Sequence, residues 1–124
     1  MAFKTVGLAA GNIPAERIVR FVSGDVTVEA AADASAPYLG VTVYAVSTGD
    51  PVFVYDDGQI GVPITADASY ADGVPLMATT GGVATTAAGL TGAATRYLIG
   101  VARRALSATR VDCNIQRAVS FRNS

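Results

Sequence analysis

The chain has 124 residues, of which 51% are hydrophobic and 15% charged, and its formal net charge is −1. This length and apolar content fit a single domain with its own core. A net charge near zero argues against non-specific binding to nucleic acids or membranes, and a single cysteine, Cys113, excludes an intrachain disulfide.

Charge is scarce and unevenly spread along the chain. Average globular proteins have about 25% charged residues, so the shortfall suggests that other subunits cover part of the surface. Residues 1–62 hold three basic and seven acidic side chains, a net charge of −4, whereas residues 63–124 hold six basic and three acidic, a net charge of +3. Two interpretations stay open: ordinary surface scatter, or complementary faces that meet between subunits.

The first twelve residues, MAFKTVGLAAGN, show no pattern typical of a core. Their apolar run is too short for a signal peptide, and the chain has no apolar run of 18 residues. We therefore expect a soluble protein made in a cytoplasm, with an N-terminal arm over residues 1–12 and a single β domain over residues 13–124. A frayed terminus is the alternative to the arm.

Short runs of Val, Ile, Thr, Tyr and Phe, separated by Gly, Pro, Asp and Ser, predict strands over most of the remaining chain. Their spacing predicts an all-β fold with little helix, a small β-barrel or a β-sandwich. Two Ala-rich stretches, 29–37 and 84–95, are interpreted as loops. The expected strands cover residues 17–22, 25–30, 38–46, 51–55, 59–65, 74–79, 83–87, 97–105 and 110–121.

The sequence VFVYDDGQIGVPI predicts a β-hairpin. Asp57-Gly58 favours a type I′ turn, in which both central residues need positive φ. Val52 and Val54 alternate with Phe53 and Tyr55, as residues of a pleated strand do.

The stretch from Tyr38 returns sixty residues later. Gly40, Val41, Ala45 and Ser47 match residues 100, 101, 105 and 107, which carry the same residue types. The turns VSGDV and TTGGV, at residues 22–26 and 79–83, extend the match at an offset of 57. We predict two pseudo-repeated β-units, at about residues 17–62 and 74–121, that close on one core.

No motif for chemistry is found. The chain has no His, so the commonest general base and metal ligand is missing. Asp56-Asp57 lacks the further oxygens of a calcium loop, and there is no nucleophile elbow, phosphate-binding loop or C-x-x-C pair. We expect no enzymatic activity, no cofactor, no metal and no small-molecule substrate.

The order of several pieces resembles the small capsid decoration, or cement, proteins of tailed bacteriophages. These pieces are GNIPAERIVRFVSGDV, YLGV, STGDPVFV, ADGVPL, TTGGV and YLIGVA, and together they span almost the whole chain. The stretch ATTGGVATT and the C-terminal QRAVSFRNS depart from the pattern of that family.

The resemblance implies a structural virion protein on the outer surface of the capsid. Its partners would be the major capsid protein and itself, as a homotrimer at threefold sites, with no nucleic acid and no membrane. It would stabilise the capsid lattice by binding only the assembled shell. The capsid-contacting arm would use residues Ala2, Phe3, Lys4, Thr5 and Val6. The alternatives are another β-rich virion or tail component, and a carbohydrate-binding module.

Overall fold

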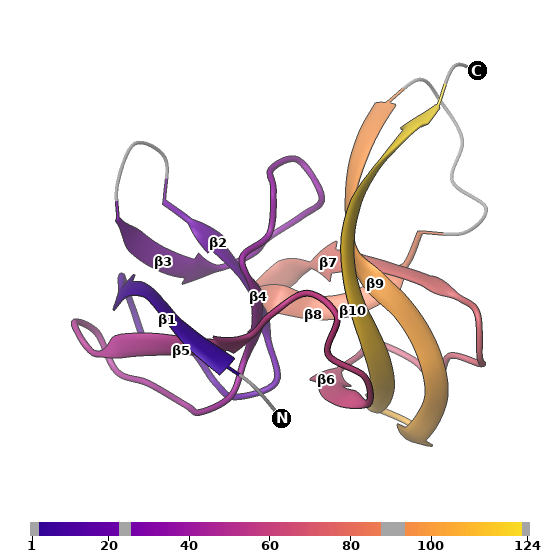
Figure 1. Cartoon of the computed structure of the whole chain (residues 1–124), viewed down its shortest axis with the longest axis horizontal. Helices are drawn as coiled ribbons and strands as arrows, with labels where there is room; N and C mark the ends of the chain where they lie inside the picture. The colour runs from indigo at the N-terminus through magenta and orange to yellow at the C-terminus, as the bar shows by residue number, and fades with distance from the viewer. Residues whose placement is uncertain (1–2, 23–25, 88–93, 123–124) are drawn as a thin grey trace.

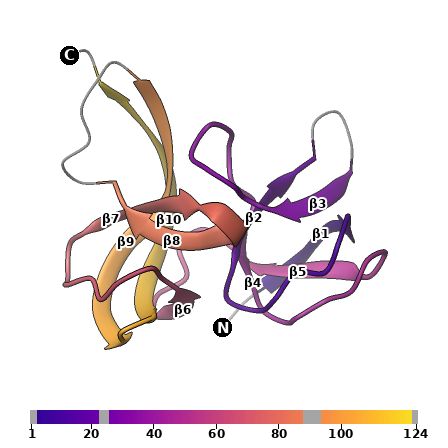
Figure 2. The ribbon, with the colours of Figure 1, turned by 180° about the vertical axis from the view of Figure 1, so that it is seen from behind.

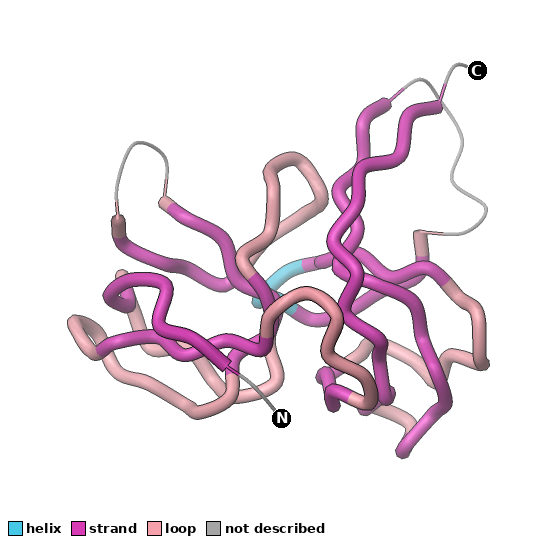
Figure 3. Tube along the Cα trace, in the orientation of Figure 1, coloured by secondary structure: helices cyan, strands magenta, loops and turns pink. Residues whose placement is uncertain are grey.

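The protein is described by a computed structural model that covers residues 3–22, 26–87 and 94–122 (Figure 1). Strands account for almost all of its regular structure, and the short helical segment lies near the middle (Figure 3). The prediction of an all-β fold with two β-units is confirmed, because the ten strands form two groups of five.

The first unit, residues 3–55, is a closed five-stranded barrel with strand order β1-β3-β2-β4-β5. Its first strand pairs in parallel with β3 and antiparallel with β5, and this second pairing closes the barrel. The strands are β1 (Phe3–Ala9), β2 (Ile18–Phe21), β3 (Thr27–Ala30), β4 (Gly40–Thr42) and β5 (Pro51–Tyr55).

The second unit, residues 62–122, is a five-stranded sheet with strand order β6-β10-β9-β7-β8. A short 3-10 helix, η1 (Thr80–Gly82), connects β7 to β8. The last two strands form a long twisted ribbon along one side of the molecule (Figures 1 and 2). The strands are β6 (Val62–Thr65), β7 (Pro75–Thr79), β8 (Val83–Thr86), β9 (Ala94–Ser107) and β10 (Arg110–Arg122).

The two units have the same topology. In the first unit β1 lies parallel to β3, and in the second a parallel bridge between Ala66 and Ala84 brings the end of β6 to β8. The other neighbours correspond in the same order and are antiparallel in both units. The predicted internal repeat is therefore present, but its copies begin at β1 and β6. The strands expected from the sequence omit β1, and the expected strand over residues 59–65, which corresponds to β6, lies at the end of the predicted first copy and not at the start of the second.

Gly40 and Gly100, the matched glycines of the repeat, share a structural reason for being glycine. A Cβ at Gly40 would overlap the carbonyl oxygen of Tyr55, and one at Gly100 would overlap that of Asn114. Both glycines let neighbouring strands approach closely. Gly40 is the first residue of β4, whereas Gly100 lies well inside β9.

The core is shared between the units. Inside the first barrel, one cluster of apolar side chains includes Val52 and Val54 of β5, and their predicted alternation with half-buried Phe53 is confirmed. A larger cluster fills the second unit and also includes four residues of the first unit. These four are Ile18, Ala31, Tyr38 and Val41. Folding of one unit therefore buries apolar surface of the other.

Candidate functional site

The residues predicted to form a free arm belong to the barrel wall. Phe3, Lys4, Thr5 and Val6 lie on β1, whose pairing with β5 starts at Phe3 opposite Tyr55. β1 is therefore part of the barrel, and the expectation that residues 1–12 form a separate arm is wrong for the part of this segment that the structure describes. Ala2 lies outside the described residues. Contact of these side chains with a capsid stays a prediction.

Asp57 and Gly58 do not form a hairpin turn. β5 pairs with β1 and β4, and β6 pairs with β10, so the two strands flanking the turn lie in different units. Gly58 has φ 86°, but Asp57 is not in the positive-φ region, which excludes a type I′ turn. The segment is the connection between the units, and the Gly58 N–H donates to the carbonyl of Ile115.

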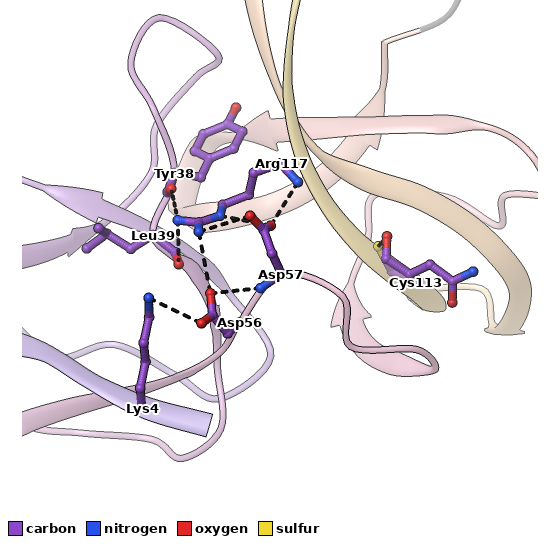
Figure 4. A network of polar contacts seen from close by, with 8 residues as sticks. Lys4, Tyr38, Leu39, Asp56, Asp57, Cys113 and Arg117 are labelled. Carbon is purple, nitrogen blue, oxygen red and sulfur yellow. Dashed lines mark hydrogen bonds and ion pairs between the residues drawn. The ribbon is translucent and has the colours of Figure 1, made fainter. Parts of the chain in front are cut away.

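Arg117 of β10 joins the units at this connection (Figure 4). Its Nε and Nη2 donate to the two carboxylate oxygens of Asp57 at 3.0 and 3.1 Å, and Nη2 also reaches Asp56 at 3.4 Å. Nη1 donates to the carbonyls of Tyr38 and Leu39 at 3.0 and 3.2 Å. These contacts match the five N–H donors of a guanidinium, a set of bonds that lysine cannot reproduce.

The acidic partners of this network respond to the positive charge. Hydrogen bonds from Arg117 hold the pKa of Asp57 below its usual value. The pKa of Asp56 is also lowered, chiefly by the backbone N–H of Asp57 and then by Lys4, whose ammonium lies 3.3 Å from the Asp56 carboxylate. Both carboxylates are thus held in the charged form that binds Arg117.

Glu16 makes a second connection between the units. It is the one non-glycine residue with positive φ, 63°, in the described part of the chain. Its N–H donates to Thr42 of the first unit, and its carbonyl accepts from Thr65 of the second, both at 2.9 Å. Its carboxylate binds Arg110 of β10 in a bidentate pair, at 2.8 and 3.1 Å. These three anchors hold a backbone conformation that an L-residue rarely adopts.

The uneven charge of the chain is used within the molecule. The second half carries the excess of arginine, and two of these arginines, Arg110 and Arg117, bind carboxylates at Glu16, Asp56 and Asp57 in the first half. Complementary faces therefore do meet, but they meet between two parts of one chain. The sequence could not reveal this, because each pair joins residues at least 60 positions apart.

Tyr38 and Tyr97, which precede the two matched Gly-Val pairs of the repeat, are structural. Tyr38 is 3% exposed in the larger core cluster, where its hydroxyl accepts from the Ala78 N–H and donates to the Asp33 carbonyl. Burial raises its pKa to about 12. Tyr97 is half-buried against the same cluster, and it lines with Tyr38 a groove of about 320 Å³ beside Arg117.

An aromatic patch, defined as Phe3, Tyr44 and Phe53, lies on the outside of the barrel. Each ring meets the other two edge-to-face, with centroids 6.0 to 6.1 Å apart. Phe3 is 46% and Tyr44 53% exposed, and neither core cluster in the described part of the chain includes any of the three. The alternation of β5 could have located Phe53 on the outer face, but not its two partners from other segments.

The described residues hold no group of three or more His, Cys, Asp or Glu side chains placed to bind a metal ion. Cys113 is free and buried, and burial raises the pKa of its thiol to about 12. None of the helical structure in the described part of the chain is long and apolar enough to span a membrane.

Comparison with known proteins finds a likeness in structure. No family model matches the chain, and no curated protein matches it in sequence. Among solved structures, the chain is similar to the head fiber gp8.5 N base of bacteriophage phi29, known from its crystal structure. The TM-score is 0.66, the match covers 93% of each chain, and 22% of aligned residues are identical. At this identity the two proteins share a fold over almost their whole length.

Proposed function

We propose that the protein is a structural component of a bacteriophage virion that binds the exterior of the icosahedral head. The observation that carries this proposal is the fold shared, over 93% of both chains, with a protein described as a head fiber base. The sequence resemblance to capsid decoration proteins also supports a role at the phage head.

In its finer form the proposal is that of a decoration protein. Trimers at local threefold sites would contact neighbouring major capsid subunits and stabilise the lattice by binding, without chemistry. A ligand that binds the expanded shell and not the compact precursor shifts that equilibrium by mass action. Many copies on one shell add their contributions even when each contact is modest.

A second function follows from the description of the similar protein as a fiber base. Such a protein would attach to the head as the anchor of an appendage, without reinforcing the lattice. The two functions share the docking step and differ in its consequence for the shell.

The test is to mix the purified protein with heads assembled without it. We expect saturable binding to expanded heads, no binding to precursor shells, and added density at threefold positions in cryo-electron microscopy. A rise in the temperature at which heads release their DNA would favour decoration, whereas binding without such a rise would favour the anchor. Absence of binding would refute both, and light scattering would show whether the free protein is a trimer.

A further inference from the structure

We propose that the protein associates with copies of itself by pairing strands edge to edge at the free end of its long ribbon. The ribbon end is defined as residues 94–96 of β9 and 118–122 of β10. The β10 edge of one copy would add to the β9 edge of the next, and three copies would close a ring. This inference rests on the proposed function, which includes trimers, and assigns the surface that forms them.

The ribbon is longer than the closing of a barrel requires. β9 lies between β7 and β10 as β4 lies between β2 and β5, so β9 and β10 hold the places of β4 and β5. The first unit closes with three residues in β4 and five in β5, whereas β9 has 14 residues and β10 has 13. The ribbon end is the part of this added length that projects away from both units (Figures 1 and 2).

The chain covers the edges of the ribbon only as far as this end. On β10, strand β6 and then the connection between the units cover the edge up to Arg117, whose backbone N–H donates to the Asp57 carboxylate at 3.0 Å. On β9, the Tyr97 N–H donates to the carbonyl of Ala34 at 3.0 Å. The backbone groups of Arg117 and Tyr97 therefore point away from the ribbon, one on each side.

Further backbone groups point outward at the ribbon end. In an antiparallel pair, every second residue directs its N–H and C=O away from the other strand. Val119 lies opposite Tyr97, and Phe121 lies opposite Thr95, so these residues share the outward direction of Tyr97. Within the described part of the chain, no hydrogen bond joins the outward groups of Thr95, Val119 and Phe121 to another segment. The ribbon end thus has two open strand edges, which are templates for pairing with another chain.

Added strands would stabilise the ribbon end. A two-stranded ribbon is at best marginally stable in water by itself, and three or more strands are needed for independent stability. Residues 94–122 contain no proline, so every residue of the two strands has a backbone N–H to donate. A partner strand on each side would bind the open backbone groups of both edges.

The two edges indicate a second copy of this chain as the partner. A ring of identical subunits needs two different surfaces on each subunit, one for each neighbour. The ribbon end offers two, the β9 edge and the β10 edge, over residues that lie opposite one another. Antiparallel pairing of β10 with β9 of the next copy would repeat the pairing that these strands already make within the chain. A strand of the capsid protein would occupy one edge and leave the other open.

The experiment removes one outward N–H at a time from the full-length protein. Phe121→Pro removes a donor from the β10 edge, and Thr95→Pro removes one from the β9 edge. Both keep the hydrogen bonds within the ribbon, because these N–H groups are not used there, and proline is tolerated on such an edge. Phe121→Ala and Thr95→Ala are matched controls that shorten the side chain and keep the donor. Val119→Pro takes the place of Phe121→Pro if circular dichroism shows that Phe121→Pro does not fold.

We expect trimers of the wild type and of both alanine variants in sedimentation equilibrium. Each proline variant should weaken each contact between copies about tenfold or more, since a buried carbonyl of the neighbour loses its donor. A mixture of Thr95→Pro and Phe121→Pro should contain more dimer than either variant alone at the same total concentration. The reason is that the first variant keeps an intact β10 edge and the second an intact β9 edge.

Loss of self-association in only one proline variant would overturn the inference, because it would mean that like edges pair. Equal association of the wild type and both proline variants would also overturn it. So would a monomeric wild type, and loss of head binding by a proline variant of that monomer would assign the edge to a capsid strand. Trimers that pair as expected but do not bind heads would instead refute the proposed function and leave this inference standing.

Discussion

Replacing Arg117 by Met removes the side-chain network that joins the two units at the connection between them. Each hydrogen bond to the carbonyls of Tyr38 and Leu39 contributes about 1 kcal/mol. The pair with Asp57, whose side chain is 48% exposed, is discounted for solvent to about 1 kcal/mol. The free energy of unfolding should therefore fall by about 3 kcal/mol, equivalent to roughly 10 °C in melting temperature for a chain of this size.

Urea unfolding followed by circular dichroism measures this change, with calorimetry as a second probe. Lys4→Met is the matched control, because it removes a single ion pair to Asp56 whose side chains are 48% and 39% exposed, for which about 0.5 kcal/mol is expected. Arg117→Lys keeps the positive charge but not the planar set of donors of a guanidinium, so its loss of stability should lie between those of Lys4→Met and Arg117→Met. The slope of the transition should not change, since the units share a core. Equal midpoints for Arg117→Met and Lys4→Met would refute the reasoning.

Three further outcomes are expected. Gly40→Ala and Gly100→Ala should each lower the free energy of unfolding by several kcal/mol, since a Cβ would overlap a backbone carbonyl, whereas Gly11→Ala, with open space around it, should change little in the same urea assay. Glu16→Ala and Glu16→Gly both lose the ion pair with Arg110, but only alanine is strained at φ 63°. Glu16→Gly should therefore have the higher free energy of unfolding, by about 1 kcal/mol. The reverse order would contradict the assignment of strain. The pKa values of Asp56 and Asp57 are lower in the folded protein than the value of about 3.9 for a carboxyl group in the unfolded chain. The stability that these two carboxylates contribute is therefore complete at pH values well above about 3.9, and it is lost as the pH falls through the lower folded pKa values. Urea midpoints measured at a series of pH values should therefore decrease once the pH is lower than about 5. The decrease should be less steep in Arg117→Met, and parallel curves for this variant and the wild type would show that the network is not the cause.

Local signals predicted much of the strand content. The alternation around Val52 and Val54 placed β5 within the bounds that the structure has, and the echo of Gly40 in Gly100 revealed the repeat. Both signals arise from constraints that act on a few neighbouring residues: the pleat of a strand, and the close approach of another backbone.

The errors concern pairing between distant segments. β1 lacks a core pattern of its own because its burial is decided by β3 and β5, the latter about fifty residues away. Asp57-Gly58 has the composition of a hairpin turn, but turn composition does not say which strands pair, and here β5 and β6 belong to different units. The contacts of Arg117 and Glu16 and the meeting of the three rings of the aromatic patch depend on the same long-range pairings, and local patterns locate at most Phe53 on the outer face of β5.

The position of Tyr38 has a consequence for synthesis on the ribosome. A growing chain emerges with its N-terminal half first, yet the buried hydroxyl of Tyr38 binds the Ala78 N–H, forty positions further along. Until β7 has been made, this ring has no core to enter, and Ile18 and Val41 lack part of theirs. The first half can therefore assemble the cluster inside its own barrel, but it cannot complete the packing around Tyr38 until β7 has been made.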